Sequence, residues 1–287
     1  MEIRTVGVCG AGAMGTGIAH TAAMAGFRVI LRDIEMERVE RSLATMDGLM
    51  QRAISKGKLT EEERVATLGR ITPATALEAF AEADFVIEAI FEDLTLKKEL
   101  FAALDRICRP DVVLASNTSS MSITEIAAAT GRPEQVVGMH FFNPAQVMRL
   151  VEVIHGYQSS DAAVQTAMDV AARLGKTAVR VRKDTPGFVV NRILMPMMIE
   201  AIKVVEEGIA TPEEVDTAIT LGLNHPMGPF TLLDFTGVDI CYNVVEYFHS
   251  EFRQPQYAPP LLMKQMVRAG RLGRKAGKGF LGEYPKA

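Results

Sequence analysis

Cysteine is scarce in this chain of 287 residues, which has only Cys9, Cys108 and Cys241 and no CxxC pair. Three cysteines so far apart do not provide the disulfide framework of a small secreted domain, nor the ligand spacing of a zinc site. The five histidines show no HExxH motif or comparable metal-ligand spacing. We therefore expect no metal site and a protein of a reducing compartment, the cytoplasm.

Long apolar runs and an excess of positive charge are also missing. No apolar run approaches the length needed to cross a membrane, and the first residues lack the basic start and continuous apolar core of a signal peptide. The formal net charge is −4, so the chain as a whole has no general attraction to nucleic acid or anionic lipid. The segment GRLGRKAGKGF is basic but short. We expect neither nucleic acid nor a membrane as a partner.

A glycine-rich turn between a strand and a helix is the first strong pattern. The apolar segment RTVGVC predicts a strand, GAGAMG follows, a helix is expected over about 14–25, and FRVILRD predicts a second strand. This succession is the βαβ unit of a dinucleotide-binding fold. Strand and helix patterns alternate further along the chain and predict an α/β, Rossmann-type domain with a mostly parallel sheet.

Three glycines of the turn have distinct expected roles. Gly10 allows the tight turn, Gly12 lets the backbone approach a pyrophosphate, and Gly15 lets helix and strand pack closely. Amide groups at the helix N-terminus supply partial positive charge for phosphates. The alternative is a glycine turn that only packs. The predicted cofactor contacts of the turn are Gly10, Ala11, Gly12, Ala13, Met14 and Gly15.

Asp33 stands at the expected end of the second strand. A carboxylate there accepts hydrogen bonds from an adenosine ribose and repels a 2′-phosphate. NAD is therefore expected as the cofactor, with NADP disfavoured. The neighbouring Arg32 offers a cation that would weaken this preference.

Polar residues follow two later strands at their carboxyl ends, where open α/β sheets bind ligands. Glu92 and Lys97 lie around the connection between the predicted strand ADFVIEAI and the predicted helix LTLKKELFAALDRI. Asn117 and Ser119 lie in SNTSS, directly after the predicted strand DVVLA. Helix capping does not account for these two side chains, so we count both as candidate cofactor contacts.

Three helix starts are marked by capping residues. Thr60 and Ser122 are each followed three residues later by Glu, which is the spacing of a capping box. Thr211 precedes a proline and two acids, the sequence expected for an N-cap and a first helical turn. Helices are expected to begin at these three positions.

Two apolar segments each carry one titratable residue. VVGMHFF predicts a strand that contains His140 and ends before Pro144, and LVEVI predicts a second strand that contains Glu152. Glu152 shares a strand face with Leu150 and Ile154, so its carboxylate needs a partner if it is buried. A histidine paired with this carboxylate would be held in one tautomer and would act as a base. By itself the pattern favours a solvent-facing Glu and an ordinary core His.

Arg52 and Lys56 are four residues apart and share one face of a predicted helix. Cations are favourable near the C-terminus of any helix. The functional alternative is a docking site for the phosphates of a long substrate. Periodicity alone favours the first interpretation.

The pattern changes to helices only after the last alternating strand. This change predicts two domains, an NAD-binding domain over 1–183 and an all-α domain over 184–287. In the second domain Phe188, Asn191, Arg192 and Met195 are expected on one stripe of a helix. A buried Asn on such a stripe would need hydrogen-bond partners.

Several motifs stand in a characteristic order, namely GAGAMGTGIA, VIEAI, LASNTSS, GMHFFNPAQVMRLVEVI, DTPGFVVNRIL, NHPMGP and LGRKAGKGF. Together they resemble the (S)-3-hydroxyacyl-CoA dehydrogenases over nearly the whole chain, and in particular the bacterial 3-hydroxybutyryl-CoA dehydrogenases. The most specific are HFFNP followed closely by LVEV, and PGFVVNR. The resemblance implies NAD-dependent hydride transfer between a 3-hydroxyacyl-CoA and a 3-ketoacyl-CoA. It also implies a homodimer formed through the helical domain, which takes part in substrate binding.

The resemblance assigns roles to individual residues. It implies that His140 is the catalytic base and Glu152 its orienting acid, which reverses the preference for an ordinary core histidine. It implies that Ser119 and Asn191 bind the substrate oxygens. It places coenzyme A at Arg52 and Lys56. Its NAD-contacting positions fall on Asp33, Glu92, Lys97, Ser119, Asn143 and Lys275.

Two alternatives remain at this point. A dehydrogenase of a free hydroxy acid, like relatives that resemble gulonate dehydrogenase, needs one cation near the carboxylate. A phosphate-bearing carrier instead needs cations at the rim, as Arg52 and Lys56 would provide. The second alternative is a nucleotide-binding protein without turnover. Such a protein has no reason to combine four residues of the implied catalytic set, Ser119, His140, Glu152 and Asn191.

Overall fold

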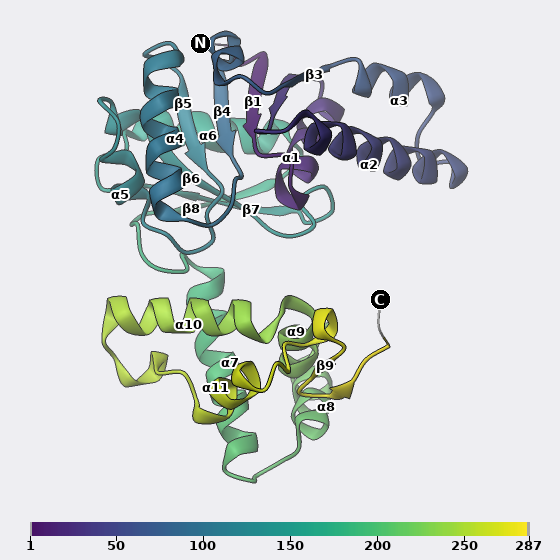
Figure 1. The fold of residues 1–287 in the computed structure, drawn as a ribbon, viewed down its shortest axis with the longest axis vertical. Helices are drawn as coiled ribbons and strands as arrows, with labels where there is room; N and C mark the ends of the chain where they lie inside the picture. The colour runs from purple at the N-terminus through teal and green to yellow at the C-terminus, as the bar shows by residue number, and fades with distance from the viewer. Residues whose placement is uncertain (1, 286–287) are drawn as a thin grey trace. The chain divides into compact units, whose positions relative to one another are not determined.

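The computed structural model describes residues 2–285, which form two compact units (Figure 1). The first unit ends at Thr185 and the second begins at Pro186. The first combines a mostly parallel sheet with helices and the second is mainly helical, so the predicted fold class is confirmed. The boundary expected from the sequence, between residues 183 and 184, lies just before this division.

An eight-stranded sheet forms the centre of the first unit. Its strands are β1 (Thr5–Cys9), β2 (Arg28–Arg32), β3 (Ile71–Ala74), β4 (Phe85–Glu88), β5 (Val113–Ser116), β6 (Val136–Phe141), β7 (Leu150–Ile154) and β8 (Thr177–Val181). Their order is β3-β2-β1-β4-β5-β6-β7-β8. All neighbours are parallel except β6 and β7, which are antiparallel. The chain direction therefore reverses once, between β6 and β7.

Helices pack on the sheet and explain why the inner strands are apolar throughout. They are α1 (Ala13–Met24), α2 (Met36–Ser55), α3 (Glu61–Leu68), α4 (Leu94–Ile107), α5 (Ile123–Ala127) and α6 (Asp161–Arg173). Ile18 of α1 and Val164 of α6 share one core cluster with strand residues such as Val8 and Val153. In Figure 1, α4 and α5 lie in front of the sheet and α6 lies behind it. A sheet covered on both faces reads as continuous apolar runs, because neither face meets water.

Two of the predicted helix starts are full capping boxes. The side chain of Thr60 accepts a hydrogen bond from the backbone N–H of Glu63, whose carboxylate accepts one from the N–H of Thr60, at 3.2 and 2.8 Å. Thr211 and Glu214 form the same arrangement. Ser122 caps α5 through its hydroxyl. These predictions from local sequence are confirmed.

The second unit packs its helices around α7. Its elements are α7 (Val190–Glu206), α8 (Pro212–Gly222), α9 (Pro229–Thr236), α10 (Val238–Phe252), α11 (Leu261–Arg268) and the short strands β9 (Lys278–Gly279) and β10 (Gly282–Glu283). One face of α7 contributes Met198 and Ile202 to a core cluster, and Met195 and Ile199 belong to another. The predicted helical domain is confirmed, with one addition: the two-residue strands β9 and β10 form an antiparallel pair. No helix within residues 2–285 is long and apolar enough to span a membrane.

The segment before α7 forms a tight turn and not the first turn of the helix. Gly187 and Phe188 both have positive φ, 74° and 53°. A Cβ on Gly187 would lie 2.0 Å from the ring of Phe248, so only glycine fits this turn. The prediction that Phe188 lies on the helix was wrong for this reason, whereas Asn191 and Met195 are within α7.

Asp234 organises the glycine-rich end of the chain. It is fully buried, and its carboxylate accepts hydrogen bonds from the N–H groups of Phe280 and Leu281, at 2.9 and 3.0 Å, and from the hydroxyl of Tyr284, at 2.7 Å. A Cβ on Gly279 would lie 2.1 Å from this carboxylate. The basic, glycine-rich motif LGRKAGKGF is therefore largely explained by the close approach of the backbone to Asp234.

We predict that the hydrogen bond between Tyr284 and Asp234 makes the stability of the protein depend on pH in the alkaline range. Burial and the hydrogen bond to Asp234 raise the pKa of Tyr284 to about 12, above its ordinary value of about 10. Tyr284 ionises at a lower pH in the unfolded chain than in the folded one. Its contribution to the free energy of unfolding is therefore complete below about pH 10 and is lost as the pH rises towards 12. Tyr284→Phe should lower the free energy of unfolding by about 1 kcal/mol at pH 8, and this difference should shrink above pH 10.

Urea unfolding of both proteins at pH 8 and pH 11 measures this difference. Tyr157→Phe is the control, because Tyr157 is 87% exposed. A difference for Tyr284→Phe that stays constant with pH would contradict the assignment.

Candidate active site

His140 and Glu152 lie directly opposite each other on the antiparallel strands β6 and β7. Nδ1 of His140 is 2.8 Å from Oε2 of Glu152. The exposed fractions of the two residues are 6% and 0%. Opposite residues of an antiparallel pair point to the same face, so the backbone register brings the predicted pair together.

The hydrogen bond determines which nitrogen of the ring carries hydrogen. An ionised carboxylate only accepts hydrogen bonds, so the Nδ1–H of His140 donates to Glu152. In the neutral ring Nε2 is then the nitrogen with the lone pair, which is the one able to accept a proton. The ring also packs on Phe142, with centroids 4.5 Å apart. This arrangement suits a general base held in one tautomer and orientation.

Asn117 connects the end of β5 to the strand that carries His140. Its side-chain oxygen accepts a hydrogen bond from the backbone N–H of Phe141 at 2.8 Å. The backbone N–H of Asn117 donates to the carbonyl of Glu88. The sequence suggested a cofactor contact for Asn117. The structure gives its side-chain oxygen an internal partner next to His140.

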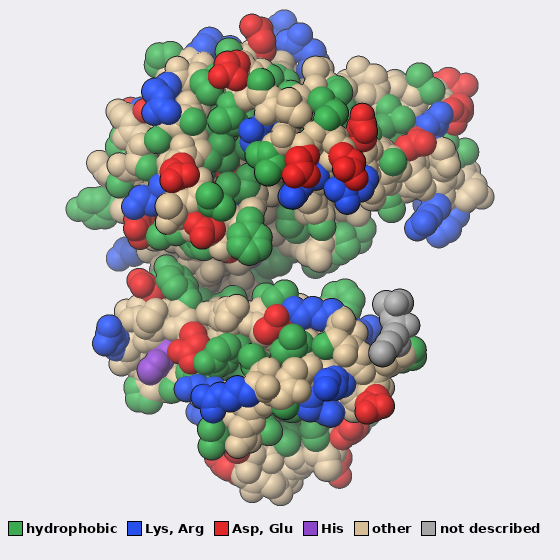
Figure 2. All heavy atoms as spheres, in the orientation of Figure 1, with side chains coloured by type: hydrophobic (Ala, Val, Ile, Leu, Met, Phe, Trp, Pro, Cys, Tyr) green, Lys and Arg blue, Asp and Glu red, His purple; other side chains and the backbone are tan. Residues whose placement is uncertain are grey.

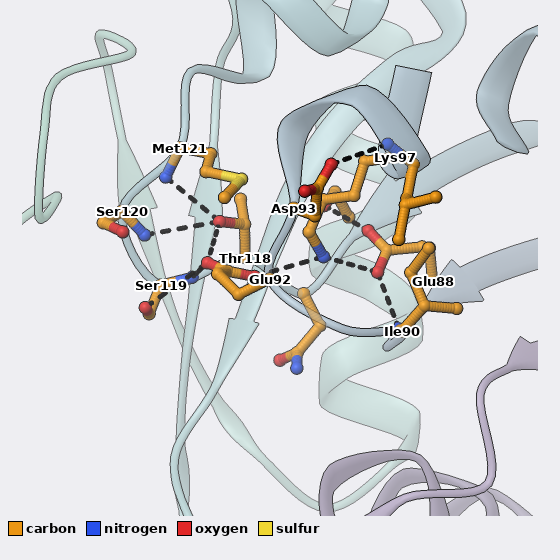
Figure 3. Close-up of polar contacts among 12 residues, drawn as sticks. Glu88, Ile90, Glu92, Asp93, Lys97, Thr118, Ser119, Ser120 and Met121 are labelled. Carbon is orange, nitrogen blue, oxygen red and sulfur yellow. Dashed lines mark hydrogen bonds and ion pairs between the residues drawn. The ribbon is translucent and has the colours of Figure 1, made fainter. Parts of the chain in front are cut away.

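A polar network surrounds Ser119 after the end of β5 (Figure 3). One carboxylate oxygen of Glu92 accepts hydrogen bonds from the Thr118 hydroxyl and from the N–H of Ser119, the latter at 3.0 Å. The other oxygen lies 3.2 Å from Nζ of Lys97. The structure thus brings together three of the predicted site residues, Glu92, Lys97 and Ser119.

Glu88 completes this network and was missed in the sequence. It is the last residue of β4 and is fully buried. Its carboxylate accepts hydrogen bonds from Nζ of Lys97 at 2.6 Å, the hydroxyl of Ser116 at 2.6 Å, and the N–H of Ile90 at 2.8 Å. An acid inside the apolar run VIEAI is the same signal as Glu152 inside LVEVI, so the sequence contained the evidence.

The glycine turn between β1 and α1 is packed on two sides and open on the third. Gly10 has φ 108°, and a Cβ there would lie 2.4 Å from the carbonyl oxygen of Ala89. A Cβ on Gly15 would lie 1.8 Å from the carbonyl oxygen of Gly10. A Cβ built on Gly12 would have no atom within 4 Å apart from its own chain neighbours. The turn therefore leaves room for a ligand where the backbone amides begin α1.

Asp33 is attached to the glycine turn. Its Oδ2 accepts a hydrogen bond from the N–H of Ala11 at 2.7 Å. The cation beside it is Arg38, whose Nε lies 3.9 Å from Oδ1. Arg32, the cation suggested by the sequence, donates through its Nε to the carbonyl of Thr75 at 2.8 Å.

A cleft of about 640 Å³ opens next to the turn. Ala11, Gly12 and Ala13 line one side of it, the first half of α2 lines another, and Asn143 closes it from the segment after β6. The cleft thus joins the predicted phosphate-binding turn to Asn143, another predicted cofactor contact.

Arg52 and Lys56 are exposed at the C-terminal end of α2. Figure 2 shows Lys and Arg side chains at the free end of the α2–α3 pair. Asn191 and Lys275 belong to the second unit. Asn191 is half-buried in the first turn of α7, and Nζ of Lys275 lies 2.7 Å from the carboxylate of Asp239.

Metal ligation and thiol chemistry have no visible basis in the described part of the chain. Within residues 2–285 there is no cluster of three or more His, Cys, Asp or Glu side chains that could hold a metal ion. Burial raises the pKa of the thiols of Cys9 and Cys241 to about 12 and that of Cys108 to about 11. A thiol with so high a pKa is a poor nucleophile at neutral pH.

Both units match sequence families that are already described. Residues 5–185 match "3-hydroxyacyl-CoA dehydrogenase, NAD binding domain", and residues 187–283 match "3-hydroxyacyl-CoA dehydrogenase, C-terminal domain". The chain belongs to the 3-hydroxyacyl-CoA dehydrogenase family. It is an NAD-binding oxidoreductase of that family, and the family resemblance noted in the sequence is confirmed.

Individual relatives of this dehydrogenase cover almost its full length. A protein of Bacillus subtilis (strain 168) named "Probable 3-hydroxybutyryl-CoA dehydrogenase" is 50% identical over 280 residues, which are 98% of this chain and 97% of the relative. The 3-hydroxybutyryl-CoA dehydrogenase of Bradyrhizobium diazoefficiens is 45% identical, with 97% and 94% covered. The crystal structure of (S)-3-hydroxybutyryl-CoA dehydrogenase PaaH1 from Ralstonia eutropha is similar with a TM-score of 0.97 and 46% identity, covering 99% of this chain and all of that one.

Proposed function

We propose that this dehydrogenase interconverts (S)-3-hydroxybutyryl-CoA and acetoacetyl-CoA with NAD as the cofactor. The buried His140–Glu152 pair carries the proposal, because it provides a proton acceptor in a fixed tautomer on a sheet that also holds the glycine turn. The relatives named 3-hydroxybutyryl-CoA dehydrogenase support a short acyl chain.

The proposed roles divide the reaction between proton transfer and orientation. NAD, when bound, supplies the hydride acceptor. In the oxidation direction Nε2 of His140 takes the proton of the substrate 3-hydroxyl, and in reduction the imidazolium returns it. Glu152 stabilises the imidazolium. Ser119 and Asn191 hydrogen-bond the substrate oxygens, where a misplacement of about 1 Å would cost about 100-fold in rate.

The residues around the glycine turn fit a dinucleotide. The open side of Gly12 faces the amides that begin α1, and these supply partial positive charge for a pyrophosphate. Asp33 lies next to the turn and disfavours a 2′-phosphate. Arg38 is also bound to Glu35, at 3.0 Å, so its charge is already shared between two carboxylates. We propose NAD over NADP on these grounds, with Glu92, Asn143 and Lys275 in the remaining cofactor-binding positions and the buried Lys97 acting on the site through its contact with Glu92.

We propose that Arg52 and Lys56 bind the phosphates of coenzyme A. Both are exposed at one end of α2, which leaves them accessible to a large, charged carrier. Exposed cations attract phosphate without a prior cost of breaking buried ion pairs. A free hydroxy acid would gain nothing from cations at this place, so the alternative substrate class is not favoured.

We also propose a homodimer formed through the second unit. Large apolar side chains are exposed there, among them Leu221, Phe235 and Leu261, which are 80%, 56% and 58% exposed. Burial of such side chains against a second copy would remove apolar surface from water. The free, buried cysteines fit a reducing compartment, and we propose the cytoplasm as the place of action.

We predict that His140→Ala lowers turnover of acetoacetyl-CoA by about two to four orders of magnitude, the range expected for lost acid–base catalysis. NADH oxidation followed by absorbance measures the rate. NADH binding should survive, because His140 is not part of the glycine turn. His155→Ala is the control, since His155 follows β7 but bonds to its neighbour, the carbonyl of Gly156. Near-normal turnover of His140→Ala would refute the assignment.

Asp33 should control the choice between NADH and NADPH. Asp33→Ser keeps an acceptor for the N–H of Ala11 and removes the charge that repels a 2′-phosphate. The ratio of kcat/KM for NADH to that for NADPH should fall by about tenfold, the effect of one lost close charge pair. Glu40→Gln, an exposed acid of α2, is the control. A wild-type enzyme that prefers NADPH would overturn the cofactor proposal.

Removal of both cations at the end of α2 should weaken binding of the coenzyme A thioester. In Arg52→Ala/Lys56→Ala we expect KM for acetoacetyl-CoA to rise about tenfold, as for two exposed charge pairs. KM for the pantetheine thioester, which lacks the nucleotide phosphates, should not change. Arg106→Ala removes a cation from the last turn of α4 and serves as the control.

The same assay separates the substrate classes. Acetoacetyl-CoA, a longer 3-ketoacyl-CoA and free acetoacetate are compared side by side with NADH. Free acetoacetate used as well as the thioester would eliminate the coenzyme A role.

A further inference from the structure

We propose that Glu88 is a positioning residue that orients the Ser119 loop through Lys97 and Glu92. The loop is residues 117–121, between β5 and α5. This inference rests on the proposed role of Ser119 at the substrate oxygens. It adds to the site a residue, Glu88, to which the family resemblance assigned no role.

Lys97 is placed where a lysine is unfavourable by itself. It is fully buried and lies in the first turn of α4. A cation near a helix N-terminus opposes the positive end of the helix dipole, and an isolated buried ammonium is strongly destabilising. The ammonium is therefore held by its two carboxylate partners, Glu88 at 2.6 Å and Glu92 at 3.2 Å.

Glu88 is the fixed end of this arrangement. Both of its carboxylate oxygens are used, Oε1 by Lys97 and the N–H of Ile90, and Oε2 by the hydroxyl of Ser116. Its backbone pairs with Cys9 of β1 and Ser116 of β5 in the middle of the sheet. Glu88 thus has a single position, and the ammonium of Lys97 takes its position from Glu88.

Glu92 is the end that reaches the loop. Its side chain is 38% exposed, whereas Lys97 and Glu88 are fully buried. While one oxygen contacts Lys97, the other accepts hydrogen bonds from the Thr118 hydroxyl and the N–H of Ser119. The oxygen of Thr118 in turn accepts from the N–H of Met121 at 3.0 Å. Figure 3 shows the continuous path from Glu88 through Lys97 and Glu92 to the loop.

The path explains how a fully buried lysine contributes to a binding site. Lys97 has no exposed surface with which to contact a cofactor. It acts on the site by fixing the carboxylate of Glu92, which is accessible. A buried ion pair kept only for stability has no need of this third, exposed member, and apolar replacements of such pairs are often neutral for stability.

The double variant Glu88→Gln/Lys97→Met separates positioning from stability. Glutamine at position 88 retains an acceptor for the N–H of Ile90 and a partner for the hydroxyl of Ser116. Methionine fills the volume of the lysine stem without a charge. The N–H of Ile90 and the Ser116 oxygen therefore keep partners while Glu92 loses its cation. The single variant Glu88→Gln is measured in parallel in case the double variant does not fold.

We expect the double variant to unfold near the wild-type temperature, with kcat for acetoacetyl-CoA reduced by about 10- to 100-fold, as for a small misplacement of a substrate-binding group. The matched control is Arg132→Met/Asp105→Asn, which removes an ion pair of 2.8 Å remote from the loop. This control should lose thermal stability and keep kcat. Wild-type kcat in the Glu88→Gln/Lys97→Met protein would overturn the proposal.

A double-mutant cycle with Ser119→Ala tests whether the effect passes through Ser119. Substitutions of coupled residues give non-additive losses. Adding Glu88→Gln/Lys97→Met to the Ser119→Ala protein should therefore lower its kcat by less than about threefold relative to Ser119→Ala alone. Fully additive losses would overturn the proposal.

Amide hydrogen exchange gives a readout that does not depend on the proposed substrate. In the protein without ligand, the amides of Ser119 and Met121 should exchange at least about tenfold faster in the double variant than in the wild type, because Glu92 no longer holds the loop. They should be unchanged in the Arg132→Met/Asp105→Asn control. Unchanged exchange in the double variant would refute positioning by Glu88, whatever activity the enzyme shows with acetoacetyl-CoA.

Discussion

The antiparallel register of β6 and β7 is the constraint on which the site depends. Glu152 has no exposed surface, and a buried carboxylate is costly unless a hydrogen-bonding partner is present. The observed antiparallel register places His140 directly opposite it. The single reversal in an otherwise parallel sheet therefore satisfies the acid, orients the ring and determines which nitrogen is basic.

A second buried acid, Glu88 at the end of β4, is likewise stabilised by hydrogen-bonding partners from other elements. Glu88 receives its charge partner from α4 and its hydroxyl partner from β5. In both cases a buried carboxylate is hydrogen-bonded to a basic side chain from another element. The result is a site whose polar groups are held by rigid neighbours, which suits a reaction in which distances decide the rate.

The features that were predictable from sequence are those encoded locally. The βαβ unit, the capping residues Thr60 and Thr211, and the acid in LVEVI depend on neighbours a few residues away. The network around Glu88 was missed because Ser116 and Lys97 join it only when strand and helix have packed.

The second unit was harder to predict because its turns are determined by distant contacts. Gly187 is required by the ring of Phe248, and Gly279 by the carboxylate of Asp234. Neither requirement is visible in the residues around the glycine. Two motifs that look like ligand-binding segments in the sequence are therefore explained in large part by close packing.

The link between β6 and β7 has a consequence for how such enzymes can diverge. The ladder of the two strands aligns His140 and Glu152, and Phe142, at the start of the connection, packs on the His140 ring. Insertions or deletions in this connection can reshape the neighbouring cleft, which Asn143 and Gln146 line, without separating the acid from the base. The shape of this cleft can therefore change over evolutionary time while the His140–Glu152 pair stays aligned.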